Sequence, residues 1–178
     1  VANALQFHKA DYLAVAYADE GVELRKAGIT MPIMVMNPEQ KSFDTIIQYR
    51  LEPELYSLRL LKQFIHTITL LRDKSQEAYP VHIELETGMN RLGFNAEDLN
   101  ELRALLTVNP LFRVKTIFTH LAGSEDPSLD DYSRMQIQRF SMMSESVIKE
   151  LNYPVWRHVL NSAGISRFPE AHFDMVRL

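Results

Sequence analysis

Residues 81–93 read Val-His-Ile-Glu-Leu-Glu-Thr-Gly-Met-Asn-Arg-Leu-Gly, and their pattern is the strongest indication of the fold in this sequence. In an extended strand, alternation places His82 and Glu84 on one face and Ile83 and Leu85 on the other. Ionisable side chains that point into a protein are costly unless they are paired or used. We therefore expect a strand whose apolar face meets outer helices and whose polar face lines an interior.

The same kind of β-rich run recurs along the whole chain and alternates with helical stretches. The runs are residues 12–17, 32–36, 53–57, 81–87, 114–120, 155–161 and 173–177. Regular alternation of strands and helices predicts a parallel sheet with helical crossovers. The predicted fold class is therefore α/β.

Two architectures fit this alternation, a doubly wound open sheet and a (β/α)8 barrel of the TIM type. No glycine-rich phosphate loop follows the first strand, as a Rossmann fold would usually show. Polar residues gather instead at the carboxyl ends of the late strands, where barrel enzymes keep their active sites. The sequence favours a barrel with about seven of its eight strands present and the first strand missing.

The ends of the chain predict an excerpt from a longer protein. Val1 stands within an expected helix, residues 1–7, and Leu178 stands within an expected strand. Residues 1–178 are therefore read as one partial barrel domain. Gly28 is expected to end the helix of residues 19–27, and Asn95 is expected to cap a later helix.

Composition excludes several classes of protein. The 178 residues are 46% hydrophobic and 24% charged, and 19 basic against 23 acidic residues give a net charge of −4. This balance argues against a nucleic-acid partner or an anionic membrane surface, because both need clustered positive charge. No apolar run approaches the roughly 20 residues that span a bilayer. The chain has no cysteine, which excludes disulfides and thiolate metal sites and fits a cytoplasmic protein.

Two candidate site residues follow strands four and five. Glycines in residues 87–93 allow a sharp turn that presents Arg91 over the barrel mouth. The alternative is a tight turn with a solvated arginine. His120 ends the next strand, where a histidine is more often structural than catalytic, although the active face of a barrel favours function.

Two further candidates follow the last strands. Asn161 and Ser162, before small residues with free amides, fit an anion cradle, or else a turn whose side chains bond their own backbone. Arg177 shares a strand face with Phe173 and Met175, so it points inward if they do. The alternative is an ordinary surface arginine. Each candidate is weak alone, and their shared location at one end of one barrel is the argument.

Taken together, these runs resemble the motifs of alanine racemases, which are pyridoxal-phosphate enzymes of fold type III. The resemblance covers essentially the whole chain, and Thr-Gly-Met-Asn-Arg-Leu-Gly is its most specific part. The matching runs are residues 12–16, 87–94, 118–122, 161–164 and 174–177.

The resemblance implies that pyridoxal 5'-phosphate binds at the barrel mouth. It assigns the phosphate to Ser162, with Asn161 shaping that side, and places His120 against the pyridine ring. Arg91 would contact the phenolic oxygen of the cofactor and the substrate carboxylate.

Arg177, in the same resemblance, would donate to the ring nitrogen and be held in place by His158. Because an arginine effectively never gives up its proton, such a donor keeps the ring nitrogen unprotonated. A weaker electron sink of this kind suits racemisation and disfavours transamination.

Two parts of the family's machinery are expected outside this chain. The Schiff-base lysine of the family lies on the first strand, and the second catalytic base is a tyrosine of a C-terminal β domain, supplied by the partner subunit of a homodimer. The chain alone is therefore expected to be inactive, to bind the cofactor poorly and to fold poorly.

The chain departs from the family pattern at two places. Glu84 stands where many members carry a carbamylated lysine beside the motif arginine. We hypothesise that Glu84 supplies a carboxylate to Arg91 directly or through water, an idea that fails if Glu84 turns away from Arg91. Glu86 replaces a usual aspartate and is read as a minor change.

Three functions remain open at this point. The first is an alanine racemase that interconverts L- and D-alanine and supplies D-alanine for peptidoglycan in the bacterial cytoplasm. The second is a racemase for serine or another amino acid. The third is a non-catalytic pyridoxal-phosphate-binding barrel protein. The resemblance also leaves open a fusion to a peptidoglycan ligase domain.

Overall fold

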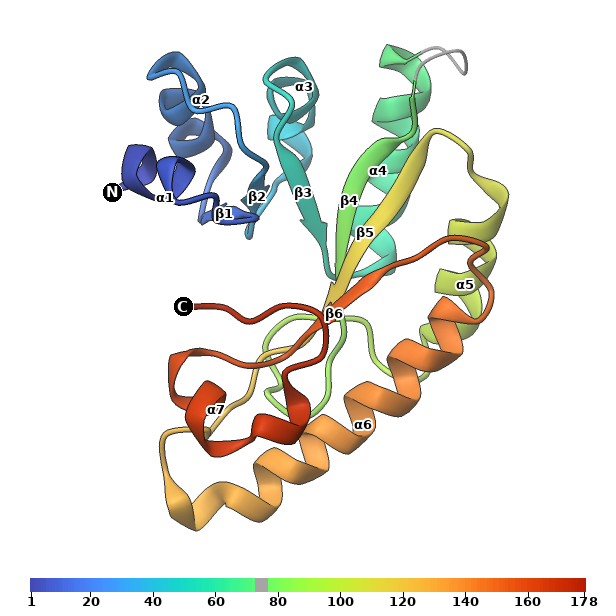
Figure 1. Cartoon of the computed structure of the whole chain (residues 1–178). Helices are drawn as coiled ribbons and strands as arrows, with labels where there is room; N and C mark the ends of the chain where they lie inside the picture. Colours follow the sequence, from blue (N-terminus) through green and yellow to red (C-terminus); the bar gives the residue numbers. More distant parts are fainter. Residues whose placement is uncertain (73–76) are drawn as a thin grey trace.

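The computed structural model describes residues 1–72 and 77–178, in which strands and helices alternate from end to end (Figure 1). The strands are β1 (Leu13–Val15), β2 (Ile33–Val35), β3 (Glu52–Leu55), β4 (Tyr79–Glu84), β5 (Phe112–Phe118) and β6 (Trp156–His158). The α-helices are α1 (Ala2–Phe7), α2 (Ala18–Lys26), α3 (Phe43–Gln48), α4 (Leu58–Leu71), α5 (Leu99–Val108), α6 (Asp130–Ile148) and α7 (Ser162–Arg167). Three short 3-10 helices are η1 (Gln40–Ser42), η2 (Pro127–Leu129) and η3 (Pro169–Ala171).

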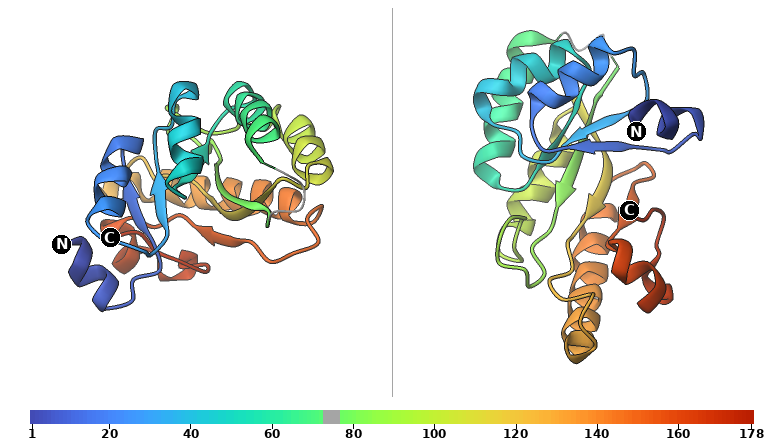
Figure 2. Two further views of the ribbon diagram at one scale, coloured as in Figure 1. Left: turned by 90° about the horizontal axis from the view of Figure 1, so that it is seen from above. Right: turned by 90° about the vertical axis from the view of Figure 1, so that its left-hand side faces the viewer.

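All six strands belong to one parallel sheet, and their order in the sheet is their order in the chain. The sheet curves, with helices along its outer side, so that it forms a half-barrel (Figure 2). Among the described residues β1 and β6 do not pair, and the half-barrel is open. The predicted α/β barrel architecture is confirmed in this partial form, and the expectation of seven strands was wrong by one.

The expected seventh strand, residues 173–177, makes only one bridge to β6, between His158 and Met175. Phe173 has a φ of 47°, which interrupts an extended course, and the side chain of Asp174 accepts a hydrogen bond from the Arg157 amide at 2.8 Å. Exposure nevertheless alternates along the run, with Phe173, Met175 and Arg177 half-buried. The inward position predicted for Arg177 is therefore correct, although the strand is not formed.

The helices bury one apolar side against the outer face of the sheet. In α4, Leu60, Leu61, Phe64 and Ile68 are buried at helical spacing, and the Ser57 hydroxyl caps the helix by accepting from the Leu60 amide at 3.3 Å. The rings of Phe43 and Phe64 meet edge to face, 5.2 Å apart, between α3 and α4.

The inner face of the sheet is polar and equally buried. Its buried polar side chains are Glu52, Glu54, His82, Glu84, Thr116 and His158. This is the interior that residues 81–87 predicted, because apolar side chains of the same strands point the other way into the helical layer. A sheet with this second, polar core has groups available for chemistry as well as for packing.

Two predicted helix ends have different outcomes. α2 ends at Lys26, and Gly28 follows with a φ of 86°, as predicted. Asn95 does not cap α5, which begins four residues later, at Leu99, with Asp98 in the N-cap position. Asn95 and Asp98 instead exchange side-chain to backbone hydrogen bonds of 3.1 Å each, and this turn satisfies both groups before the helix begins. No helix in the described ranges is long and apolar enough to cross a bilayer.

Candidate active site

The candidate residues gather at the carboxyl ends of the strands, where the loops and α7 lie (Figure 1). Parallel strands deliver their carboxyl ends to one edge, so residues from distant parts of the chain meet there. Arg91 follows β4, His120 follows β5, Asn161 and Ser162 follow β6, and Arg177 closes the chain.

The loop after β4 is held by Glu86. Its carboxylate accepts hydrogen bonds from the amide of Gly88 and, at 3.4 Å, from the amide of Arg91. Glu86, read from the sequence as a minor change, therefore shapes the turn that presents Arg91. The Arg91 side chain is exposed, and its charge acts on His120 and Arg177 by lowering the pKa of each.

His120 and Arg177 are in direct contact. Nη2 of Arg177 donates to Nδ1 of His120 over 2.5 Å. Burial, followed by the charges of Arg177 and Arg91, lowers the pKa of His120 to about 4. His120 is therefore neutral near pH 7, which leaves its Nδ1 atom free to accept a hydrogen bond from the guanidinium.

His158 lies deeper and does not hydrogen-bond to Arg177, contrary to the expected support of Arg177 by His158. Its Nε2 atom lies 3.3 Å from the Thr116 hydroxyl, and its ring stacks on Phe118 at 4.7 Å. Burial, then His82 and Arg177, lowers the pKa of His158 to about 3. His158 is thus a neutral buried ring near Arg177, and His120 is the hydrogen-bond partner of that guanidinium.

A buried hydrogen-bonded chain crosses the inner face beneath this pair. Nε2 of His82 lies 3.0 Å from a Glu52 oxygen, and its Nδ1 atom lies 2.9 Å from the Thr116 hydroxyl. Since a carboxylate only accepts, Nε2 of His82 is the donor to Glu52. The Thr116 hydroxyl lies between the rings of His82 and His158, so these contacts link β3 to β6 across the inner face.

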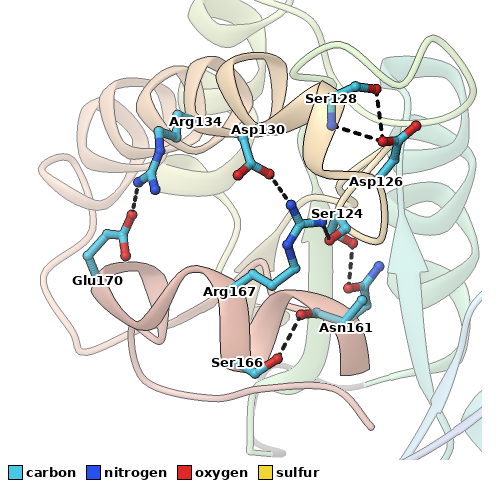
Figure 3. Close-up of polar contacts among 10 residues, drawn as sticks. Ser124, Asp126, Ser128, Asp130, Arg134, Asn161, Ser166, Arg167 and Glu170 are labelled. Atoms are coloured by element: carbon cyan, nitrogen blue, oxygen red, sulfur yellow. Dashed lines mark hydrogen bonds and ion pairs between the residues drawn. The ribbon is translucent and has the colours of Figure 1, made fainter.

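Asn161 stands at the beginning of α7 and orders it. Its Oδ1 atom accepts from the Gly164 amide at 3.0 Å. The same atom accepts from the Ser124 hydroxyl at 2.7 Å (Figure 3). Arg167 donates to the Ser124 carbonyl and pairs with Asp130, so α7 is tied to the start of α6. The Asn161 amide oxygen thus fits the self-bonded turn, whereas Ser162 is exposed and its hydroxyl has no partner in the described part of the chain.

The sequence gave no reason to single out Gln136, yet it joins two site loops. This buried side chain of α6 donates to the His120 carbonyl at 3.2 Å and accepts from the Ala122 amide at 2.9 Å. Its amide nitrogen also lies 3.5 Å from the Thr87 hydroxyl. One signal could have revealed it, since a glutamine at an inward helical position is rarely buried without a task.

Glu84 does not pair with Arg91. No ion pair joins the two side chains among residues 1–72 and 77–178, and Glu84 is buried whereas Arg91 is exposed. The hypothesis of a direct Glu84–Arg91 pair is therefore corrected. The short side chain of Glu84 stays within the buried inner face of the sheet, while Arg91 stands on the exposed loop.

The donor set at this end of the sheet fits the expected cofactor. Two guanidiniums, a free hydroxyl at the start of α7 and a neutral flat imidazole suit a ligand with a phosphate and an aromatic ring. In the described ranges, no group of three His, Cys, Asp or Glu side chains could hold a metal ion. The site thus offers positive charge and hydrogen-bond donors for an anionic organic molecule.

Known proteins are similar to this chain in sequence and shape over most or all of its length. The alanine racemase N-terminal domain family matches residues 1–178. The alanine racemase of Carboxydothermus hydrogenoformans is 33% identical over 99% of this chain and 47% of its own length. That of Halalkalibacterium halodurans is 36% identical over 94% of the chain and 42% of its length.

Solved structures agree. An alanine racemase of Clostridium difficile 630 covers 99% of the chain with a TM-score of 0.88 and 31% identity, and the chain covers 45% of it. One from a D-cycloserine-producing Streptomyces lavendulae has a TM-score of 0.87 and 26% identity, over 99% and 46% of the two chains. The chain spans about half the length of these relatives. Residues 1–178 belong to the alanine racemase N-terminal domain family.

Proposed function

We propose that the full-length protein is an alanine racemase, a pyridoxal-phosphate-dependent isomerase that interconverts L- and D-alanine. The observation that carries this proposal is the family match over every residue of a chain whose Arg91, His120 and Arg177 lie around one end of the half-barrel. By the same family relation, we expect a cytoplasmic homodimer that supplies D-alanine for peptidoglycan.

Side chains of the loops and of α7 would hold the cofactor and the substrate. Ser162 would donate its free hydroxyl to the phosphate at the start of α7, a turn that Asn161 keeps in shape. His120 would lie against the ring as a neutral imidazole, and Arg91 would bind the substrate carboxylate, for which a forked donor is suited. Arg91 is exposed at the mouth, where an entering amino acid can reach it.

Arg177 would face the ring nitrogen. When bound, the cofactor supplies an electron sink that makes the Cα proton of an amino acid acidic. Arg177 donates and keeps its own proton, so an acceptor atom opposite it stays unprotonated. The buried position of Arg177 lowers its pKa, but the nearby Glu54 and Glu84 oppose this and help to keep it charged.

The proton-transferring lysine and tyrosine of the family are expected outside residues 1–178. This chain would therefore contribute binding and orientation, while the remainder of each subunit and its partner would contribute the two bases. His158 would support the site from the buried side. Its neutral ring lies near Arg177 and is held by Thr116 and Phe118.

The test uses the full-length protein purified with pyridoxal phosphate. We expect a visible absorption band of the bound cofactor, exchange of the Cα proton of L-alanine in heavy water, and formation of D-alanine. A band without exchange of any amino acid would instead indicate a non-catalytic binding protein. Exchange of serine but not of alanine would indicate a related racemase, and absence of the band would overturn the proposal.

A further inference from the structure

Both ends of α7 are attached to one buried serine in the loop after β5. Ser124 is fully buried, so its polar atoms need partners. Its hydroxyl donates to Oδ1 of Asn161, the residue before α7, over 2.7 Å. Its carbonyl accepts from Nη1 of Arg167, the last residue of α7, over 2.5 Å. Ser124 therefore links the beginning of this helix to its end.

Helix α7 depends on contacts of this kind. It has six residues, and a helix this short is not stable through its own hydrogen bonds. At its beginning, the Ile165 amide donates to the Asn161 carbonyl at 3.1 Å, and the Gly164 amide donates to the Asn161 side chain at 3.0 Å. The turn at Asn161 and Ser162 is thus held in place by the residues that bind Asn161 from outside the helix.

Arg167 is itself held by Asp130, at the beginning of α6. Nη2 of Arg167 donates to Asp130 while Nη1 binds Ser124, so the guanidinium reaches both groups (Figure 3). The side chains of Arg167 and Asp130 are 22% and 39% exposed, and ion pairs in contact with water contribute little to stability. A guanidinium is planar, however, and its donors point in fixed directions. The pair with Asp130 therefore fixes the direction from which Arg167 holds Ser124.

A second arginine in the same region provides a comparison. Arg134 of α6 pairs with Glu170 of η3, just beyond α7. The guanidinium carbons of Arg134 and Arg167 lie 5.3 and 5.6 Å from the centre of the same ring, that of Phe168. Within the described ranges, only Arg167 of the two also bonds to Ser124. The two ion pairs are alike in place and exposure, and they differ in their connection to Asn161.

We propose that Arg167 is a positioning residue for the phosphate group of the cofactor. Held by Asp130, it fixes Ser124, and Ser124 fixes Asn161 and the turn that presents the Ser162 hydroxyl. The assignment rests on the proposed function, in which Ser162 binds the phosphate. It gives Arg167, Asp130 and Ser124 a task in ligand binding, although none of them needs to touch the ligand.

Two ligands that differ only in the phosphate test this role in the full-length protein. The Kd is measured for pyridoxal 5'-phosphate and for pyridoxal, which lacks the phosphate. The ratio of the two constants isolates the contribution of the phosphate, because a general loss of structure weakens both. For Arg167→Gln we expect the Kd of pyridoxal 5'-phosphate to rise about tenfold and that of pyridoxal to change by less than about twofold, as when one hydrogen bond to the phosphate is lost.

Two further variants sharpen the result. Arg134→Gln removes the neighbouring ion pair and is the matched control, in which the ratio should stay unchanged. Ser124→Ala removes the hydroxyl that reaches Asn161 but keeps the carbonyl and Asp130 as partners of Arg167. It should lower the ratio as Arg167→Gln does, and the double variant should lose no more than either single one, because both act through one chain of contacts. Ser124→Ala also decides the matter if Arg167→Gln does not fold.

Hydrogen exchange gives a readout that needs neither cofactor nor activity. In the cofactor-free protein, mass spectrometry should show faster amide exchange in residues 161–168 for Arg167→Gln and Ser124→Ala than for the wild type and Arg134→Gln. The reason is that the bond from the Gly164 amide to Asn161 opens more often when Asn161 is released.

The outcomes separate the two proposals. If the wild type prefers pyridoxal 5'-phosphate to pyridoxal and Arg167→Gln keeps the whole of this preference, the role of Arg167 is overturned and the proposed function stands. Equal weakening of both ligands also overturns it, because Arg167 would then be a general structural residue. A wild-type protein that does not bind pyridoxal 5'-phosphate overturns the proposed function, and the role of Arg167 with it.

Discussion

Arg177 donates to Nδ1 of His120, and this contact couples the charge states of two site residues. Burial is the largest cause of the lowered pKa of His120, and the charge of Arg177 is the next. The two groups share a partly buried space but differ in whether they lose their proton. An arginine keeps its proton under these conditions, and the histidine gives up its own.

The Arg177→Gln variant should raise the pKa of His120 from about 4 part of the way toward 6.5. The rise is partial because burial, the larger cause, remains. NMR titration of the His120 ring measures it. Arg59→Gln, at an exposed arginine of α4, is the control and should leave His120 unchanged. An unshifted His120 in Arg177→Gln would show that the contact does not influence its charge.

The lowered pKa of His120 should make the free energy of unfolding depend on pH. Its pKa in the folded protein, about 4, lies below the ordinary 6.5, so the unfolded chain binds more protons between these values. The stabilisation is therefore present above about pH 6.5 and is lost as the pH falls toward 4, at up to about 1.4 kcal/mol per pH unit.

Glu54 titrates in the opposite sense, because its raised pKa favours the folded state at low pH. The prediction is therefore a difference between two proteins. The Tm of the full-length His120→Gln variant should fall less steeply with acid than that of the wild type between about pH 6.5 and 4. Parallel curves would contradict it.

At the scale of elements, the loops that carry the site are held by side chains of neighbouring elements. Gln136 of α6 bonds to both sides of the turn after β5, and Tyr132 of the same helix donates to the Gly88 carbonyl. The hydroxyls of Thr87 and Thr119 join the two loops directly at 2.9 Å. α6 therefore acts as a support for the mouth of the half-barrel.

Gln136→Leu should destabilise the protein by about 1–3 kcal/mol, because it leaves the Ala122 amide and the His120 carbonyl without their partner. Gln138→Leu, two residues further along α6 and exposed, is the control and should change stability by less than about 0.5 kcal/mol. Chemical denaturation measures both. Equal destabilisation by the two substitutions would mean that the hydrogen bonds of Gln136 add nothing to stability beyond the contribution of an exposed glutamine.

Gly93→Ala tests the close approach of the loop after β4. Gly93 has a φ of 119°, and a Cβ there would lie 2.5 Å from the Glu86 amide nitrogen. Gly28→Ala shares the positive φ but meets nothing within 4 Å. We expect about 1–2 kcal/mol of destabilisation for Gly28→Ala and more than this for Gly93→Ala. Thermal unfolding that ranks the two in the reverse order would contradict this account.

For the whole molecule, the open sheet is the dominant feature. β1 and β6 form the edges of the described half-barrel, and the two chain ends lie on the same side of the molecule in each view (Figure 2). Unpaired strand edges leave backbone groups without partners and offer sites for association. The remaining strands of a closed barrel would satisfy both edges at once.

The 178-residue chain produced alone should therefore unfold without a cooperative thermal transition, in contrast to the full-length protein. Circular dichroism during heating measures the two side by side. A sharp transition for the short chain would show that the half-barrel is an independent folding unit and would overturn this expectation.

The sequence was enough to predict the α/β class of fold and its parallel sheet, and it placed the candidate site residues at the carboxyl ends of the strands. These follow from local patterns, since the alternation of β-rich and helical runs and the polar residues at strand ends need no knowledge of contacts. The motif of residues 87–93 likewise identified the family without a structure.

Which side chains meet depends on the tertiary structure. Arg177 contacts His120 across 57 positions, and Gln136 reaches Thr87 across 49. Such contacts depend on strand register and on the curvature of the sheet, and a one-residue shift would reverse the face of every side chain. Periodicity shows which residues point inward. How deeply each side chain is buried, and which partners it contacts, depends on the tertiary fold.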